Sequence, residues 1–553
     1  MINDILFQLK YLFPKISFDK KKKVNQRLKE SFGQLKDDNF NFENIEKYFR
    51  NKDNSKAYQV LSDKTCNDLD FDDLFMFLDR TNSKVGQQYF YNKLRVINFD
   101  KEEVKFNEDL INELSINSEL RVSIQNKLDK LNHKDAYYIS TLFQETHIKP
   151  PKWFFAIKIL SFSSLVSLIL GFFNPMFFIL LLGMFCVNFV LHYWNKNNLV
   201  QYVSSIPQLI KLNNIASHLF NNSLFKKINP ELSKSIKLIN EVKNRMHFFQ
   251  LEAKLQGELE IIAWLFFEIL KTMFLLEPLL LFGVLKRLNT KRNEIENVFK
   301  FVGHIDMLIS IASLRNGLDT FCLPEINQKD TIEAKNISHP LIFNCTTNSI
   351  NISEKSVLLT GSNMSGKTSF IRAIGINVIT GLTINTCFAE SMTFPLLKVF
   401  SAIRISDDLM NDKSYYFEEV LTIKEILKES VSGNKNLFLL DEMFKGTNTV
   451  ERISAGKSVL SALAKHNNKI LVSTHDIELT DMLSNEYDLY HFSETVENET
   501  VGFDYKLKRG KLQNRNAIRI LEINNYPKEV INEAIAISKE LDKVYLQKKN
   551  AKM

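Results

Sequence analysis

Three short apolar runs in the C-terminal half of the chain end in polar or glycine-containing clusters. They are Val357–Leu359, Asn436–Leu440 and Ile470–Val472. Short apolar runs bounded in this way are typical of strands buried in a parallel sheet. A helical stretch follows the first run. The pattern therefore predicts an α/β domain whose polar residues gather at the carboxyl ends of its strands.

Residues 57–337 show helical periodicity instead. Apolar residues recur at intervals of three and four, which predicts amphipathic helices with one buried face. The last stretch begins after Thr290, a residue type that caps helix N-termini. We therefore predict an all-α region before the α/β domain. The apolar positions are Leu110, Ile111, Leu114, Leu128 and Leu131; Leu209, Leu212, Ile215, Ala216, Leu219 and Phe220; and Ile295, Val298, Phe299, Val302, Ile305, Leu308, Ile309 and Ala312.

Two longer runs in this region, Phe154–Phe173 and Pro175–Tyr193, are apolar on every side. Each has about 20 residues, which is enough to cross a hydrocarbon core of about 30 Å. Trp153 and Trp194 lie at the two outer ends of the pair of runs, as aromatic residues do at membrane interfaces. Lysines flank both ends, and the positive-inside rule therefore places both ends in the cytoplasm. We therefore predict a transmembrane helical hairpin at residues 153–194. The alternative is a hairpin buried in a soluble core.

A third apolar run, Ile261–Leu288, differs from the first two because charged residues interrupt it. The residues that interrupt the run or its start are Glu258, Glu260, Glu268, Lys271, Glu277 and Pro278. Charges in the middle of a span are costly in lipid. The run is therefore predicted to form a pair of core helices and not a membrane span.

The run Val357–Leu359 leads into residues 361–368, which match Gly-x-x-x-x-Gly-Lys-Thr. The glycines of such a loop let backbone N–H groups face a polyphosphate, and the next helix N-terminus favours its charge. Lys367 is expected to reach the β- and γ-phosphates, and Thr368 to ligate Mg²⁺. A chance match in a Gly/Ser turn is the alternative. The residues expected to bind the nucleotide are Gly361, Ser362, Asn363, Met364, Ser365, Gly366, Lys367, Thr368 and Ser369.

The other two runs end in residues that suit nucleotide hydrolysis. Asp441 follows the second run and is placed to hold the Mg²⁺ shell, while Glu442 is placed to polarise an attacking water. His475 follows the third run, where it could sense the γ-phosphate. The alternatives are an acidic turn and a structural histidine.

Taken together, Thr360–Thr480 resembles the ATPase domain of the MutS family, the ABC-type ATPases of DNA mismatch repair. The Asn363-Met364 pair inside the loop is the most specific match, and Ser362 and Ser365 depart from the family's loop. Residues 441–449 resemble the family's Asp-Glu-x-x-Arg-Gly-Thr-Ser-Thr, and Thr474-His475 resembles its Thr-His switch. The resemblance implies ATP hydrolysis with Mg²⁺, with Glu442, His475 and Lys367 as the catalytic residues.

A fourth match implies a dimer. Asp407-Asp408-Leu409, followed by residues 413–419, resembles the family's signature segment. In ABC-type ATPases the signature serine, here Ser414, contacts the γ-phosphate bound by the other protomer. The resemblance thus implies a homodimer with shared sites. An ordinary helix N-cap is the alternative for Ser414.

The resemblance also suggests how the chain is divided. It implies a basic, polar N-terminal segment at 1–56, a helical core and lever domain at 57–337 that contains the hairpin, an ABC-type ATPase domain at 338–512, and a helical dimerisation region at 513–553. Segment 1–56 contains no Phe-x-Glu, the pattern of the family's mismatch-reading wedge. Direct recognition of a mismatch is therefore not expected from this segment.

Composition does not decide between the two functions that the MutS resemblance and the predicted hairpin suggest. The net charge of +7 is too small for 553 residues to indicate nucleic-acid binding by itself. Five cysteines without metal or redox spacing fit a reducing cytosol. The first hypothesis is a dimeric ATPase that binds branched or mismatched DNA and is tethered to the cytoplasmic membrane, with the ATPase domain and both termini in the cytoplasm. The second is a membrane-associated ATPase that acts on a membrane or protein partner.

Overall fold

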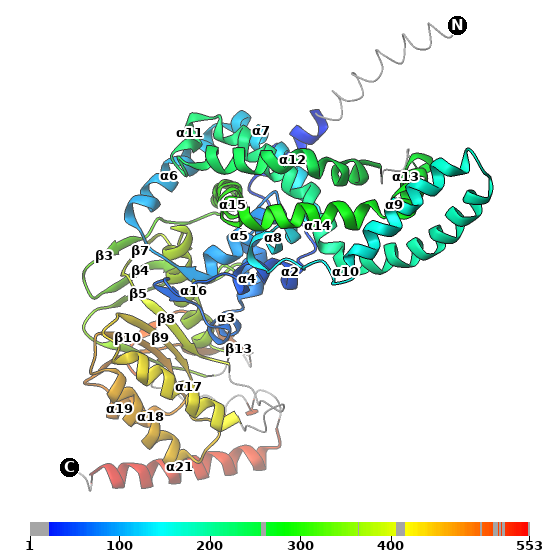
Figure 1. The fold of residues 1–553 in the computed structure, drawn as a ribbon. Helices are drawn as coiled ribbons and strands as arrows, with labels where there is room; N and C mark the ends of the chain where they lie inside the picture. Colours follow the sequence, from blue (N-terminus) through cyan, green and yellow to red (C-terminus); the bar gives the residue numbers. More distant parts are fainter. Residues whose placement is uncertain are drawn as a thin grey trace. The chain divides into compact units, whose positions relative to one another are not determined.

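The computed structural model describes residues 22–255, 261–362, 364–404, 415–497, 500–512, 518, 521–522 and 526–550 (Figure 1). Packing divides the chain into two compact units. The helical unit contains Met1–Lys56, Phe75–Arg95 and Asp100–Leu318, and the sheet unit contains Ala57–Leu74, Val96–Phe99 and Asp319–Met553. This division places residues 57–74 and 319–337 in the sheet unit. The sequence predicts both segments within the helical domain instead, with a boundary at residue 338, and those domain bounds stay a prediction.

The described part of the helical unit has a core built around α15 (Arg292–Asn316), which packs against α5 (Lys84–Arg95), α6 (Lys101–Ile116) and α12 (Leu232–Leu255). Gly303 of α15 lies so close to α5 that a Cβ there would meet the Tyr89 Cβ at 2.6 Å. Asp306 accepts hydrogen bonds from the backbone N–H groups of Asn82 and Ser83, which lie just before α5. These contacts join residues more than 200 positions apart in sequence. Further helices of this unit include α2 (Phe42–Arg50), α7 (Ser118–Leu128), α8 (Thr141–Gln144) and α11 (Ser223–Lys226).

The predicted hairpin consists of α9 (Phe154–Gly171) and the first half of α10 (Met176–Phe220), which run side by side in Figure 1. Only 22% of the residues in the most apolar stretch of Phe154–Gly171 and 17% of those in Met176–Trp194 are buried, and the mean hydropathies are 2.0 and 2.1. By length and composition both could cross a membrane. In a third candidate, Leu276–Asn316, 89% of the residues of the most apolar stretch are buried within the protein. The apolar run Ile261–Leu288 forms two packed helices, α13 (Ile261–Phe274) and α14 (Leu276–Leu288), as predicted.

The sheet unit contains a six-stranded sheet with the order β14-β11-β6-β10-β9-β8. Strands β11, β6, β10, β9 and β8 are parallel to their neighbours, and β14 is antiparallel to β11. The three predicted strands are its centre, with every residue of β6 and β10 buried. The bounds are β6 (Ser356–Thr360), β8 (Lys398–Ala402), β9 (Asn436–Asp441), β10 (Asn468–Ser473), β11 (Tyr487–His491) and β14 (Lys508–Arg509).

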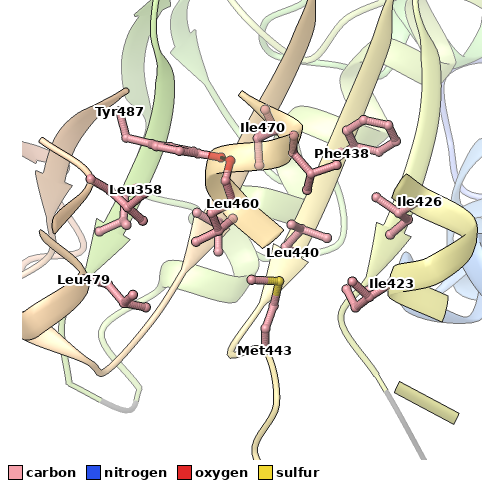
Figure 2. Close-up of a cluster of buried hydrophobic side chains, with 14 of the residues drawn as sticks. Leu358, Ile423, Ile426, Phe438, Leu440, Met443, Leu460, Ile470, Leu479 and Tyr487 are labelled. Atoms are coloured by element: carbon pink, nitrogen blue, oxygen red, sulfur yellow. Dashed lines mark hydrogen bonds between the residues drawn. The ribbon is translucent and has the colours of Figure 1, made fainter. Parts of the chain in front are cut away.

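Side chains alternate across this sheet, so each face has its own helices. Phe438 and Leu440 of β9 face a cluster with Leu460 of α18 (Thr449–Leu463) and Ile423 of α17 (Tyr415–Ser430) (Figure 2). Leu439 faces the other way, where a Cβ on Gly375 of α16 (Lys367–Ile384) would meet its Cδ1 at 2.4 Å. The sheet is therefore covered on both faces, as its continuous apolar strands require.

A second, four-stranded sheet has the order β3-β7-β4-β5, with parallel and antiparallel pairs. Its strands are β3 (Glu325–Asn327), β4 (Ile332–Ile337), β5 (Asn348–Ile352) and β7 (Ser391–Pro395). The short helix α3 (Asp63–Asp68) supports the edge strand β8, because Asp68 accepts hydrogen bonds from Ser401 Oγ and from the backbone N–H groups of Ile403 and Arg404. Further elements of the chain include α4 (Phe71–Leu78), β1 (Gln59–Val60), β2 (Val96–Ile97), α19 (Ile477–Met482), β12 (Glu494–Glu497), β13 (Thr500–Phe503) and α21 (Lys528–Asn550).

Candidate active site

The glycine-rich loop connects the buried strand β6 to the N-terminus of α16. Gly361 and Gly366 have φ angles of 150° and 103°, and Met364 has a φ of 68°. Because these angles are open to glycine but strained for most other residues, the two glycines allow the sharp turn before the helix. Met364 is 82% exposed at the tip of the loop. The predicted ligand Asn363 lies outside the described residues.

Lys367, the first residue of α16, folds back over the loop. Its Nζ donates hydrogen bonds to the backbone carbonyls of Gly361 and Ser362, at 2.8 and 2.9 Å. The side chain is 4% exposed, and burial lowers the pKa of Lys367. Two loop carbonyls therefore hold the ammonium group at the place where the loop would enclose a phosphate.

Two oxygen ligands of the kind Mg²⁺ prefers meet beside this lysine. Thr368 Oγ1 donates a hydrogen bond of 2.7 Å to Asp441 Oδ2 at the end of β9, and Ser473 Oγ donates to the other carboxylate oxygen from the adjacent β10. Proteins often bind Mg²⁺ through one or two such groups together with substrate phosphates. The residues present thus fit this metal. No cluster of three or more His, Cys, Asp or Glu ligands occurs in the part of the chain that the structure describes.

Glu442 follows Asp441 and contacts two basic side chains. Its Oε1 lies 2.7 Å from His475 Nε2, and its Oε2 lies 2.7 Å from Lys445 Nζ. The hydrogen bond from His475, opposed by burial and aided by Lys445, lowers the pKa of Glu442 to about 2. The backbone of Glu442 has a φ of 49°, an uncommon angle for this residue type. The carboxylate is therefore ionised at neutral pH and fixed at the strand end.

Buried charges hold the neighbouring segments in place. Glu419 of α17 is 1% exposed, and its carboxylate accepts a hydrogen bond from the backbone N–H of Phe444, while burial raises its pKa. Arg452 of α18 forms two hydrogen bonds, of 2.9 and 2.6 Å, with the carboxylate of Asp476. The turns that carry Glu442 and His475 are thus both tied to the helices on the same face of the sheet.

A cavity of about 450 Å³ opens beside the loop. Its lining combines loop residues and Glu442 with apolar and aromatic groups, a combination that suits a ligand with a polyphosphate and a ring. His339 lines the cavity, and burial, with a smaller contribution from Arg372, lowers its pKa to about 4. The lining residues are Ile337, His339, Ile342, Phe343, Asn344, Cys345, Thr346, Asn348, Ser362, Met364, Ser365, Gly366, Lys367, Thr368, Ser369, Phe370, Ala373, Glu442, Phe492 and Tyr505.

The structure thus brings most of the predicted residues together and adds others. Asp441, Glu442 and His475 meet the loop at one edge of the sheet, whereas Ser414 lies outside the described residues. Sequence reasoning missed Lys445 and Ser473, which touch the predicted carboxylates. It also missed Glu494, whose carboxylate accepts a hydrogen bond from Ser362 in the loop.

The chain matches a known domain over the region just described. Residues 357–542 match MutS domain V. Residues 357–542 thus form a MutS-type domain. This domain includes the strands β6, β9 and β10 and the residues Lys367, Asp441, Glu442 and His475.

Curated relatives agree with this MutS assignment. The chain is 28% identical over 266 residues to the DNA mismatch repair protein MutS of Fusobacterium nucleatum, 28% over 264 residues to that of Clostridioides difficile, and 28% over 262 residues to that of Aquifex pyrophilus. These matches cover 43%, 45% and 45% of this chain, and 29%, 28% and 30% of the relatives. The chain thus spans less than a third of the length of the MutS proteins it matches.

Proposed function

We propose that this chain is a Mg²⁺-dependent ATPase of the MutS family that works as a homodimer tethered to the cytoplasmic membrane. The observation that carries the ATPase proposal is the meeting of Lys367, Thr368, Asp441, Glu442 and His475 beside one cavity. The loop residues Gly361, Ser362, Asn363, Met364, Ser365, Gly366 and Ser369 would surround the phosphates. MutS proteins are named for DNA mismatch repair, so DNA is the first candidate partner.

The proposed chemistry begins with binding of the triphosphate. Lys367 would exchange its two loop carbonyls for phosphate oxygens, since these carry more negative charge. Thr368 and Asp441 would hold Mg²⁺, which supplies charge neutralisation on the phosphates when bound. Apolar and aromatic lining residues such as Ile342 and Phe343 would contact the base.

Glu442 would orient the water that attacks the γ-phosphate. A carboxylate with a pKa of about 2 is a poor proton acceptor at neutral pH. Glu442 would therefore act as a base only after its contacts with His475 and Lys445 loosen. The imidazole of His475 contacts the Glu442 carboxylate in the structure. If His475 moves to contact a bound γ-phosphate, its contact with Glu442 would loosen, so that the activation of Glu442 would depend on the γ-phosphate. Hydrolysis is thus proposed to require a rearrangement at the end of β10.

Dimerisation and membrane attachment complete the proposal. Ser414 would reach the γ-phosphate held by the second protomer, so that each site needs two chains. Exposed apolar helices support attachment through residues 153–194, with the ATPase domain and both termini in the cytoplasm. In the domain arrangement we propose, residues 57–337 carry the levers and the hairpin, 338–512 the ATPase, and 513–553 the dimer contact.

The substrate distinguishes two versions of this function. In the first, the protein binds branched or mismatched DNA, in line with the names of its relatives. In the second, it acts on a membrane or protein partner without reading DNA, which the large exposed apolar surface of α9 and α10 favours. Binding of the solubilised dimer to homoduplex, mismatched and branched DNA across a salt series separates them. Preference for one DNA structure that depends on nucleotide supports the first version.

Replacing Glu442 by Gln tests the ATPase itself. The amide keeps the shape of the side chain but cannot accept the water's proton. We expect hydrolysis to fall by about 10²- to 10⁴-fold while ATP binding persists and a dimer accumulates, as measured by phosphate release and light scattering. Lys367→Ala should instead abolish ATP binding.

The matched control is Glu354→Gln, which makes the same chemical change at an exposed position of the sheet unit. It should hydrolyse ATP at the normal rate. Normal turnover by Glu442→Gln would remove Glu442 from its proposed role, and tight ATP binding by Lys367→Ala would contradict the assignment of the loop.

A further inference from the structure

Helices α13 and α14 form a second, shorter helical hairpin beside the first one. They meet at Leu275, which has a φ of 48° and reverses the chain between Phe274 and Leu276. α13 packs against both α9 and α10, and α14 packs against α13 and α9. Figure 1 shows α13 and α9 next to each other in the helical unit. The 14 and 13 residues of α13 and α14 give lengths of about 20 Å each, too short to cross a core of about 30 Å.

Direct contacts give the depth that this short hairpin reaches along the long one. The rings of Trp153 and Trp194 lie 5.5 Å apart and mark one level at the open end of the long hairpin. Asn188 donates hydrogen bonds to Ser164 Oγ, at 3.1 Å, and to the backbone carbonyl of Met273, at 2.7 Å. Counted along the helices, Asn188 and Ser164 lie about 9 and 16 Å beyond the tryptophans.

The short hairpin then returns to the level from which it came. The ring of Phe282 in α14 lies 5.0 Å from the ring of Phe154, next to Trp153. The end of α13 is therefore near the middle of the long hairpin, while α14 comes back to its open end. A chain that enters a layer, turns at half depth and leaves on the same side has the geometry of a re-entrant segment.

The outer surface of α13 suits contact with lipid chains. Leu265, Phe266 and Ile269 are 49%, 64% and 49% exposed. They continue the exposed apolar surface of α9 and α10, which includes Phe162 and Val187. Exposure of this apolar surface to water is unfavourable. The hydrocarbon of a bilayer would cover it together with the exposed surface of the long hairpin.

Three of the charges that argued against a membrane position, Glu268, Lys271 and Glu277, are buried in the protein, and the other two, Glu258 and Glu260, lie outside the described residues. Lys271 is fully buried, and its Nζ lies 2.6 Å from Glu268 Oε2 and 3.5 Å from Glu277 Oε2. His192 of α10 lies 3.2 Å from Glu268 Oε1. Ionisable residues at membrane depth are tolerated where they face the bundle interior and pair with one another. The arrangement therefore removes the physical objection that the sequence raised.

We propose that α13 and α14 form a re-entrant hairpin that enters the same leaflet as the open end of the long hairpin and turns near mid-membrane at Leu275. Its partner is the hydrocarbon of the bilayer, which contacts Leu265, Phe266 and Ile269. The inference rests on the proposed membrane attachment of residues 153–194. It makes the membrane part of the protein a four-helix unit and not a simple two-helix anchor.

The test uses the full chain without substitutions, reconstituted in phosphatidylcholine nanodiscs. A carbene-generating diazirine dissolved in the acyl layer is activated by light, and labelled residues are mapped by mass spectrometry. Val450 and Met482, which are 75% and 51% exposed in the sheet unit, serve as apolar controls outside the membrane. We expect Ile269, the deepest of the three exposed residues of α13, to be labelled most heavily among them. Leu265–Ile269 as a whole should be labelled less than Phe162 and Leu182 but at least about tenfold more than the controls, because the probe concentrates in the hydrocarbon core.

The outcomes separate this inference from the proposal on which it rests. Label on the long hairpin, with Leu265–Ile269 at the level of the controls, would overturn the re-entrant hairpin and leave the membrane anchor in place. Label at control level on both hairpins would overturn the anchor, and with it the re-entrant hairpin. A Phe266→Glu variant, which adds a charge on the outer face only, should lose label at Leu265–Ile269 and keep it at Leu182.

Discussion

The sheet of the sheet unit and the α9–α10 hairpin of the helical unit distribute their side chains in opposite ways. In the sheet, Phe438 and Leu440 are fully buried, and the polar residues Asp441 and Glu442 emerge at its edge. In the hairpin, large apolar residues such as Phe155 and Phe162 are 64% and 68% exposed, whereas Ser164, Ser167 and Asn188 are inside. One arrangement suits water outside and the other suits hydrocarbon outside. The two regions are thus proposed to have different solvents.

The largest expected effect comes from placing charges on the outside of the hairpin. The double variant Phe162→Asp, Leu182→Asp changes one exposed residue in the middle part of each candidate span, Phe154–Gly171 and Met176–Trp194. Each aspartate at a span centre costs about 2.5–3.5 kcal/mol on insertion scales. We expect the double variant to move from the membrane pellet to the soluble fraction after alkaline carbonate washing.

The same two changes in the sheet unit provide the matched control. Val450→Asp, Met482→Asp alters residues that are also exposed, so the wild-type distribution should persist. Retention of the hairpin variant in the carbonate pellet, at the level of the control, would mean that the exposed surface of α9 and α10 is not covered by lipid.

The same Leu→Ala substitution should have different effects on the stability of the sheet core and of the hairpin. Leu440→Ala removes a fully buried side chain from the cluster in Figure 2 and should cost about 2–5 kcal/mol. Leu180→Ala removes the same atoms from a side chain that is 52% exposed in the hairpin. Denaturant unfolding in detergent should show a large shift for the first variant and little for the second. Equal shifts would indicate that protein, and not detergent, covers Leu180.

Buried histidines give each unit a pH dependence. Burial lowers the pKa of His339 in the sheet unit and of His304 in the helical unit to about 4. The unfolded chain then binds more protons than the folded chain between pH 6.5 and 4, so the free energy of unfolding should fall as pH decreases through this window. The loss should approach about 3 kcal/mol for each histidine. Substituting either one with glutamine should flatten the pH profile of its own unit, and an unchanged slope would contradict its burial as a neutral ring.

The central strands of the sheet could be predicted from sequence because their cause is local. β6, β9 and β10 are continuous apolar runs, and a polar cluster marks the end of each. The apolar helices of the hairpin, α9 and the first part of α10, could also be predicted from the sequence. That they cross a membrane stays a prediction. α10 continues through Pro207 to Phe220 as one helix of 45 residues, which the separate patterns on its two halves did not indicate.

Contacts between residues that are far apart in the sequence could not be predicted from the sequence. Segment 57–74 folds with the sheet because Asp68 accepts hydrogen bonds from residues more than 330 positions away, and no periodicity encodes this pairing. Lys445 looks like an ordinary turn lysine until Glu442 is seen beside it. Likewise, Glu268, Lys271 and Glu277 argued against a membrane position because the sequence does not show that they contact His192 and one another.

The smallest expected effect concerns the polar side chains inside the helical unit's hairpin. Asn188→Ala removes the hydrogen bonds to Ser164 and to the carbonyl of Met273, which join α10 to α9 and α13. Such bonds between helices in membranes average only about 0.6 kcal/mol, because the unfolded chain in lipid also finds partners. We therefore expect a loss of about 1 kcal/mol for Asn188→Ala, measured by reversible unfolding in mixed micelles, and almost none for the adjacent, 52% exposed Val187→Ala. A loss of several kcal/mol would mean that Asn188 is surrounded by a water-excluding protein core whose unfolded state is fully hydrated, and the inside-out comparison between the two regions would then be wrong.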